Sequence, residues 1–432
     1  MNSRRTPAGC NERAQPRTRL ADRRPRRWLS TRTAPARYGP PMNTSAPDRP
    51  ASLPVAALAG VTATVSVFAL AQGLSYPLFT FLMQEQGLPP ALIGLSAAMT
   101  PLGIIASAPF VPRLTRLVGA ARLAIACALI AALLLFLVGW LQNGWAWFLL
   151  RFLIGVAIDP LYVLSEVWMI SLAPAARRGR IMGLYTAIVG AGFAGGPLTL
   201  FIVGTAGWAP FAIGIAAFLV CVGILVVIGP RLPTMLDDHA AVPLKDFLHL
   251  APALLMATAV AAAFEQSVLS LLPVYGAAYG IAAAAMAALL TVMISGNIVL
   301  QLPLGLLAER VSPRLLLIGC AAISAAGAAL IPALIQTPAI WPLLFVVGAT
   351  GYGIYTMALI ELGNRFTGSA LVAGNAAFAV MWGVGGIAGP PGAGFAIQAF
   401  GPQGLPVVMV AMCVGLVAFA LYREKVRRRG GG

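Results

Sequence analysis

Long apolar runs constrain this chain more than any other feature of its sequence. About twelve of them approach the ~20 consecutive apolar residues that a helix needs to cross a bilayer. Of the 432 residues, 59% are hydrophobic and only 10% are charged, and the mean hydropathy is +0.87. A soluble globular chain is roughly 45–50% apolar and about 25% charged. The sequence therefore predicts an all-α membrane protein.

The apolar runs form two groups of six. We expect membrane helices at 53–75, 91–111, 121–141, 145–170, 180–204, 209–229, 251–275, 283–307, 314–334, 339–362, 370–398 and 404–422. The chain then divides into a disordered basic N-terminal tail (1–50), a first bundle (51–230), a cytoplasmic linker (231–250), a second bundle (251–424) and a basic, glycine-rich tail (425–432). Met42 is an alternative start, because the residues after it lead directly into the first run.

Basic residues gather in alternate loops. If the N-terminus is cytoplasmic, the outer loops carry no Lys or Arg, and the inner loops carry residues such as Arg113, Arg122 and Arg310. This is the positive-inside pattern, and it predicts a multi-pass protein of the cell's inner membrane with both termini in the cytoplasm. Together with the basic tails, it accounts for the net charge of +16 without a nucleic-acid partner.

The two groups of runs repeat each other. The shift of 193 residues that carries Gly155 onto Gly348 also carries Tyr162 onto Tyr355. The same shift superposes Cys127 on Cys320, Gly87 on Gly280, Gly192 on Gly385, Gly196 on Gly389 and Pro197 on Pro390. We therefore expect two six-helix bundles of parallel topology, with a solute site between them near the middle of the membrane.

Three segments carry a more specific pattern. They are Gly183, Gly192 and Gly196-Pro197 in the fifth run, "RFLIG" (151–155) in the fourth, and "GLLAERVSPR" (305–314) after the eighth. These resemble the antiporter motif, the Arg-x-x-x-Gly motif and the loop motif of the major facilitator superfamily. Leu200 replaces a glycine of the first motif, and Arg116 replaces the acid of the matching loop in the first half. The resemblance implies the twelve-helix facilitator fold and secondary transport. The antiporter motif favours export, but it also occurs in importers.

Two charged side chains are expected to face one central cavity. A charge at the middle of a bilayer costs roughly 2.5–3.5 kcal/mol, so it needs a partner, water or a function. Arg151 lies roughly 9 Å below the outer start of its helix, and Glu265 lies roughly 21 Å above the inner start of its own, which places them at similar depth. We expect them to contact solute or proton and to pair directly or through solute or water. The alternative is a permanent structural ion pair.

Other polar residues complete the predicted pathway. Asp159 is a candidate proton carrier, or it satisfies backbone groups freed at Pro160. The candidate solute contacts, each of which is alternatively an interhelical hydrogen bond, are Gln72, Tyr76, Gln266, Tyr352 and Tyr355. The expected cytoplasmic latch residues are Glu166, Glu309, Arg310, Arg314, Glu361 and Arg365. The expected helix-packing and bending residues are Gly183, Gly192, Gly196, Pro197, Gly385, Gly389 and Pro390.

The motifs of ATP-driven transport and of metal chemistry are missing from the sequence. Neither of its two lysines follows a glycine, so there is no P-loop, and the two histidines form no H-E-x-x-H. We therefore expect a proton-coupled exporter of a small organic solute, a monomer in the lipid bilayer with no cofactor, no metal and no enzymatic activity. The alternatives are a proton symporter or uniporter that imports a small organic solute, and a non-transporting receptor on the same fold.

Overall fold

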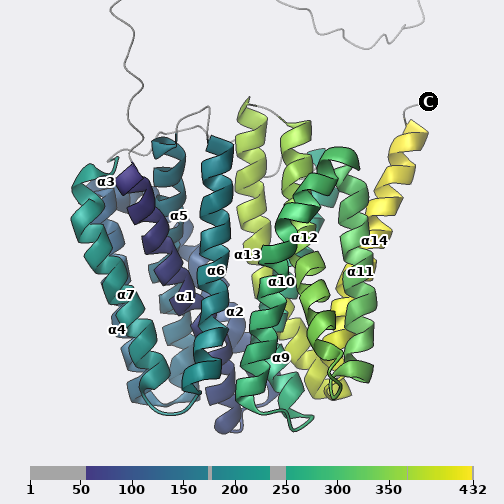
Figure 1. The fold of residues 1–432 in the computed structure, drawn as a ribbon, viewed down its shortest axis with the longest axis horizontal. Helices are drawn as coiled ribbons and strands as arrows, with labels where there is room; N and C mark the ends of the chain where they lie inside the picture. Colours follow the sequence, from purple (N-terminus) through teal and green to yellow (C-terminus); the bar gives the residue numbers. More distant parts are fainter. Residues whose placement is uncertain (1–54, 174–177, 234–249, 367, 431–432) are drawn as a thin grey trace, which may run out of the picture. The chain divides into compact units, whose positions relative to one another are not determined.

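Long helices make up nearly all of the chain that the computed structural model describes (Figure 1). The described residues are all except 1–54, 174–177, 234–249, 367 and 431–432, so the N-terminal tail and most of the linker lie outside them. The long helices are α1 (Val55–Glu85), α2 (Pro90–Ser107), α4 (Ala120–Leu141), α5 (Gly144–Leu172), α6 (Arg178–Val203), α7 (Ala209–Ile228), α9 (Pro252–Ala277), α10 (Ala283–Arg310), α11 (Pro313–Leu334), α12 (Ile340–Arg365), α13 (Gly368–Phe400) and α14 (Gly404–Gly430). A short helix, α3 (Val111–Val118), follows α2.

These helices confirm the predicted fold class. Among the described residues, 11 helices are long and apolar enough to cross a membrane. The 33-residue α13 packs between α9 and α2 and completes the predicted set. Two helices, α1 and α14, extend well beyond their predicted ends. α1 continues through Pro77 because the residues up to Met83 remain apolar and buried, and α14 continues into the basic tail, where positive charge suits a helix C-terminus.

The repeat is visible in the helix–helix contacts. Gly103 of α2 packs against the backbone carbonyl of Phe152 on α5, and Gly296 of α10 packs in the same way against Phe345 of α12. A Cβ atom at either glycine would collide with that carbonyl. The other matched contacts are Gly155–Thr100 with Gly348–Met293, and Gly192–Ser66 with Gly385–Ala259. The glycines that reveal the repeat are therefore points where equivalent backbones touch.

The turn that follows the first helix of each half is also the same. Gly87 and Gly280 both have φ of +71°, a left-handed conformation that ends a helix and favours glycine. The closing hydrogen bonds are Leu88 N to Met83 O at 3.0 Å and Ile281 N to Gly276 O at 3.1 Å. Equivalent glycines therefore end α1 and α9 in the same way.

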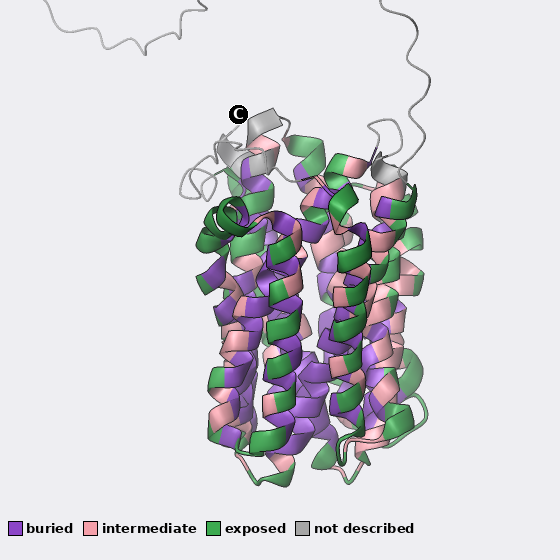
Figure 2. Cartoon of the chain, turned by 90° about the vertical axis from the view of Figure 1, so that its left-hand side faces the viewer, coloured by how far each residue is buried: buried purple, intermediate pink, exposed green. Residues whose placement is uncertain are grey.

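The two halves meet along several helix pairs within the unit Leu53–Gly432. α2 contacts α13, α6 contacts α10, and α9 contacts both α1 and α2. Figure 1 shows α1 beginning and α14 ending on one side of the bundle, which we call the terminal face. The opposite side, where α1 ends at Glu85, is the far face. Buried residues lie between the helices, and exposed residues lie on their outward surfaces (Figure 2).

The halves are closed against each other toward the far face. Every residue of α1 from 71 to 83 and of α9 from 266 to 276 is buried, so these segments have neighbours on all sides. Thr80 Oγ1 donates a 2.7 Å hydrogen bond to the Ser270 carbonyl and joins α1 to α9. Nearby, α2 and α13 touch where Gly394 packs against the Pro90 carbonyl. We call this region, 71–83 with 266–276, the far-face closure.

Candidate functional site

The start of α5 fixes the position of Arg151. The Asn143 side chain caps the helix by accepting a 2.9 Å hydrogen bond from Trp145 N. One turn on, Trp147 Nε1 donates to the Val138 carbonyl of α4 at 3.1 Å. Arg151 follows Trp147 by one further turn, so its guanidinium extends from an anchored segment.

Arg151 is the one basic side chain that is fully buried among the described residues, with 1% of its surface exposed. Its Cζ lies 4.7 Å from the centre of the Phe79 ring of α1, and this ring meets Trp147 edge-on at 6.2 Å. Nε and Nη1 of Arg151 have no hydrogen-bond partner within the described chain. A buried charge without acceptors is costly, so this arrangement calls for a function.

Glu265 lies in the same region on α9 and is half-buried. It forms no ion pair with Arg151. The structure therefore shows neither a direct contact nor a permanent ion pair between the two predicted charges. Tyr76 of α1 lies within electrostatic range of both charges. The site therefore holds one positive group and one acidic group that are not paired, with a tyrosine in electrostatic range of both.

Tyrosines surround Glu265. The predicted contacts Tyr76, Tyr352 and Tyr355 all lie within its electrostatic range, as does Tyr162 of α5. Tyr355 is held by α13, where it packs edge-on against Trp382 with 4.8 Å between ring centres. The four helices α1, α5, α9 and α12 thus each contribute to the surroundings of one carboxyl group.

Two glutamines add hydrogen-bonding groups to this site. Gln72 and Gln266 are both buried, and Gln266 is 7% exposed. The Gln266 side chain approaches the Tyr76 hydroxyl, while its Oε1 has no partner in the described chain. Gln72 approaches Tyr162. Gln72 and Glu265 are equivalent positions of the repeat, so one position supplies an amide in the first half and an acid in the second.

Asp159 belongs to a different contact. It is 4% exposed and accepts a 2.9 Å hydrogen bond from Ser107 Oγ, which ties α5 to the end of α2. Its partner in the structure is a side chain and not the backbone near Pro160, and its role as a proton carrier stays a prediction. Asp159 is closer to the terminal face than Arg151 because it lies two turns further along α5.

The predicted latch residues lie toward the terminal face. Glu166, Glu309, Arg310 and Arg365 are exposed, and Glu361 is half-buried. Arg365 lies over the Phe366 ring at 5.5 Å and makes no ion pair with Glu361. Arg314 Nη2 donates a 3.0 Å hydrogen bond to the Ala420 carbonyl of α14. The side chains of Arg177, Arg178 and Arg180, the basic residues of the loop that follows Glu166 in the sequence, lie outside the described residues.

The predicted packing glycines lie at helix crossings. Gly192 and Gly196 pack against the backbone of α1, and Gly385 and Gly389 pack against that of α9. Pro197 lies inside α6 and Pro390 inside α13. Gly183 lies in α6, and its surroundings are outside the described part of the structure.

Sequence reasoning missed the aromatic residues that hold the site. Phe79 follows Tyr76 by three residues and Gln72 by seven, so the helical period places it on the same face of α1. Tyr162 was visible as the repeat partner of Tyr355 but was not assigned to the site. Ser107 gives no sequence signal, because its contact with Asp159 depends on how two helices pack.

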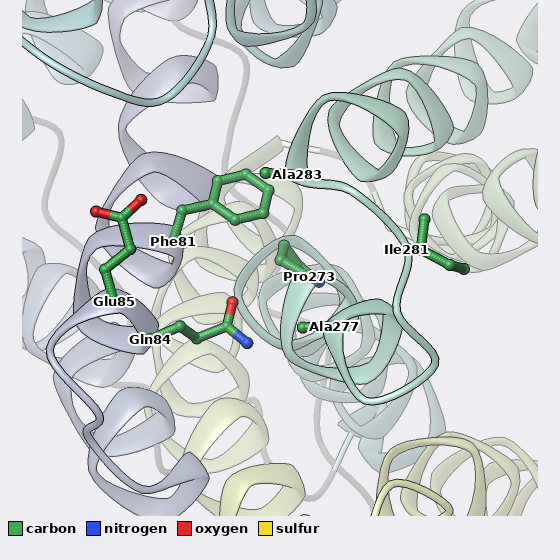
Figure 3. A pocket seen from close by; sticks show the side chains of 7 residues that line it. All are labelled: Phe81, Gln84, Glu85, Pro273, Ala277, Ile281 and Ala283. Carbon is green, nitrogen blue, oxygen red and sulfur yellow. The ribbon is translucent and has the colours of Figure 1, made fainter.

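A pocket lies beyond the far-face closure, at the ends of α1 and α9. Its volume is about 280 Å³. Figure 3 shows the residues that line it, which are Phe81, Gln84, Glu85, Pro273, Ala277, Ile281 and Ala283. Thr80 and Ser270, which join α1 and α9, precede these residues on their helices. Among the described residues, no group of three or more His, Cys, Asp or Glu side chains is placed to hold a metal ion.

Comparison with known proteins decides the family. The family model of the Major Facilitator Superfamily matches residues 61–362 and 254–431. The chain belongs to the major facilitator superfamily. An uncharacterized MFS-type transporter of Bacillus subtilis, YfkF, is 27% identical over 347 residues, which cover 78% of this chain and 87% of the relative. The uncharacterized MFS-type transporter YcaD of Escherichia coli is 26% identical over 66% of this chain and 74% of its own.

Solved facilitator structures share the fold. The nucleoside transporter NupG superposes with a TM-score of 0.68 at 14% identity, covering 85% of this chain and 98% of the other. A bacterial homologue of the human lysosomal transporter Spinster, in an inward-facing and occupied conformation, gives a TM-score of 0.66 at 14% identity, covering 86% and 96%. This chain is therefore a multi-pass membrane protein with the facilitator transporter fold.

Proposed function

We propose that this facilitator is a proton-coupled secondary transporter that exports a small organic solute by alternating access and does not convert it chemically. Arg151 and Glu265 are the central residues of its site. Gln72, Tyr76, Gln266, Tyr352 and Tyr355 line the pathway, and Asp159 is a second proton-carrying group. The bundles 51–230 and 251–424 move against each other about this site. The transporter acts as a monomer in the lipid bilayer.

One observation carries this proposal: Arg151 and Glu265 lie between the two halves, inside the membrane helices, without pairing with each other. Intramembrane ionisable groups are costly and persist mainly on solute or ion pathways. A carboxyl group among tyrosines gains and loses charge as its access to water changes, which is what proton coupling requires. An unpaired guanidinium is free to exchange partners during the cycle.

The orientation and the moving parts follow from charge and packing. We place the terminal face in the cytoplasm, because basic residues such as Arg113 and Arg310 lie at that end, and we place the protein in the cell's inner membrane. Glu166, Glu309, Arg310, Arg314, Glu361 and Arg365 are then cytoplasmic latch residues. The glycine–proline segments of α6 and α13 are bending points beside α1 and α9.

Export is supported by the Gly183–Pro197 pattern of α6. The runner-up is import of a small organic solute by the same site, as a proton symporter or a uniporter, since the pattern also occurs in importers. A non-transporting receptor would keep the fold but would show no solute flux.

Reconstituted protein tests these alternatives. Solutes that raise the unfolding temperature of the detergent-solubilised chain are selected first, and their flux is then measured in liposomes with and without a pH gradient. We expect gradient-driven flux in the wild type and its loss in Arg151→Gln and Glu265→Gln. The matched controls Arg113→Gln and Glu85→Gln change an exposed charge of the same kind and should remain active. Activity in both site variants would contradict the assignment.

A further inference from the structure

Arg151 is the buried positive charge next to the far-face closure. The guanidinium lies beside the closure, stacked on Phe79, and Phe79 belongs to the closed segment 71–83 of α1. Closing this segment leaves Arg151 with 1% of its surface exposed and with Nε and Nη1 without an acceptor in the described chain. An arginine in contact with water would have these hydrogen bonds supplied by the solvent.

The groups around Arg151 do not neutralise it. Phe79 and Trp147 are aromatic, and Tyr76 is a neutral hydroxyl group when protonated. Glu265, the acidic group of the site, is not in an ion pair with Arg151. An isolated charge taken out of water is strongly unfavourable, and a hydrogen-bonded counter-charge offsets that cost. The Arg151 guanidinium beside the far-face closure is therefore suited to an anionic acceptor.

We infer that the transported solute carries one carboxylate-type anionic group, which binds the guanidinium of Arg151, and that this binding promotes the far-face closure. The inference rests on the proposed function, because it names the solute class of that same site. It makes Arg151 the element that couples solute occupancy to the conformational change.

The chemistry of the site narrows the solute further. Guanidinium binds carboxylate through two parallel hydrogen bonds, and a terminal ammonium does not. Arg151 is the single fully buried basic side chain of the described residues, so one negative charge is matched and a second is not. The Phe79 ring lies against the guanidinium, and the Trp147 ring meets Phe79 edge-on. We therefore expect a monocarboxylate with an apolar or aromatic body.

Matched probes test the first part of the inference, that a carboxylate binds Arg151. The purified full chain is titrated with benzoate and 2-naphthoate, and with benzamide and 2-naphthamide, which keep the shape but remove the charge. Unfolding temperature and intrinsic tryptophan fluorescence report the binding. We expect the wild type to prefer carboxylates over amides, and Arg151→Gln to bind carboxylates more than about thirtyfold more weakly. Arg113→Gln should retain the wild-type preference.

Three results would overturn the expected carboxylate binding. They are binding of the amides as tightly as the carboxylates, no binding of either carboxylate by the wild type, and a carboxylate preference that survives in Arg151→Gln. Arg151→Lys separates charge from shape: it keeps the positive charge but loses the planar fork, so we expect affinity between those of wild type and Arg151→Gln.

The second part of the inference, that anion binding at Arg151 promotes the far-face closure, can be tested first without a ligand. Spin labels at Gln84→Cys and Ala277→Cys, on a chain without its native cysteines, report the distance between the far-face ends of α1 and α9. We expect Arg151→Met to be closed without any anion, because it buries no charge. The wild type should be more open alone and should close when 2-naphthoate is added. Arg113→Met should behave as wild type.

Identical distance distributions in Arg151→Met and wild type would overturn the claim that anion binding at Arg151 promotes the far-face closure. Failure of the inference is distinguishable from failure of the proposed function. Proton-driven transport of a neutral solute, with no carboxylate preference, would keep the function and remove the inference. Carboxylate binding and closure without any proton-driven flux would keep the inference about Arg151 and remove the proposed function.

Discussion

At the scale of single residues, the site is defined by groups that lack partners more than by groups that have them. Arg151 stacks on one aromatic ring and leaves two nitrogen atoms without acceptors. Glu265 lies among tyrosines and outside any ion pair with Arg151. Asp159, in contrast, has a defined partner in Ser107. The Ser107 contact therefore joins α2 to α5 at the group that we propose as the second proton carrier.

Glu265→Gln tests the acid of the site. The amide keeps the shape of the side chain but cannot release a proton, so coupling should be lost while solute still binds. We expect gradient-driven accumulation to disappear and gradient-independent solute exchange to persist, measured with the same solute in the same liposomes. Accumulation that persists at wild-type rate would show that the coupling proton is carried elsewhere, with Asp159 the next candidate.

The hydrogen bond between Ser107 and Asp159 is testable by a double-mutant cycle. Ser107→Ala removes a donor from a buried carboxyl group and should destabilise the chain by about 1–3 kcal/mol. The same change in an Asp159→Asn background should cost less, because the charge is already gone. The control is Ser66→Ala, whose hydroxyl bonds only within its own helix, to the Thr62 carbonyl at 2.7 Å. Equal costs in both backgrounds, measured by chemical denaturation in detergent, would rule the coupling out.

At the scale of helices, glycine sets how closely the pairs approach. Gly196 of α6 lies against the backbone of α1, and Gly389 of α13 lies against that of α9. Backbone atoms cannot move aside as a flexible side chain can, so a methyl group at either position separates two helices. The repeat was readable from sequence for this reason, since the contact excludes other residues and leaves glycine as a visible mark in both halves.

Alanine substitutions test this element-scale role. Gly196→Ala and Gly389→Ala should each destabilise the chain by about 1–3 kcal/mol through overpacking. Gly223→Ala in α7 is the matched control, because nothing lies within 4 Å of the added Cβ and alanine is the better helix former. We expect Gly223→Ala to be neutral or stabilising in thermal unfolding of detergent-solubilised protein. An equal loss of stability in all three variants would refute the close-approach explanation.

The sequence predicted the helices, and it placed the two charges at similar depth, but it did not predict their partners. Arg151 and Glu265 were placed at similar depth because each helix residue advances by ~1.5 Å. Whether the two side chains meet depends on helix rotation and rotamer, which a one-dimensional pattern does not contain. The first predicted helix ends at 75, whereas α1 continues through Pro77 to Glu85 because the packed far-face closure buries this segment.

At the scale of the whole molecule, the two halves are alike in backbone and unlike in charge. Equivalent turns at Gly87 and Gly280 and equivalent crossings show one architecture used twice. The charged residues of the site break this symmetry, because Arg151 occurs only in the first half and Glu265 only in the second, where the equivalent positions hold Leu344 and Gln72. Movement of one half against the other therefore changes the surroundings of two opposite charges.

The orientation of the molecule gives a prediction of its own. Arg113→Cys on the terminal face should react with a membrane-impermeant maleimide only after the cells are permeabilised. Glu85→Cys on the far face should react in intact spheroplasts. Both native residues are exposed, so reactivity reports sidedness. The opposite labelling pattern would invert the cytoplasmic assignment of the terminal face.

Solute-evoked proton movement in liposomes tests the central claim most directly. Purified protein is reconstituted with pyranine trapped inside, and a solute found by the thermal screen is added outside at equal pH on both sides. The account predicts a pH change inside wild-type liposomes that is absent in Glu265→Gln and Arg151→Gln but present in Glu85→Gln. Solute flux by the wild type with no proton movement, or proton movement unchanged in both site variants, would contradict it.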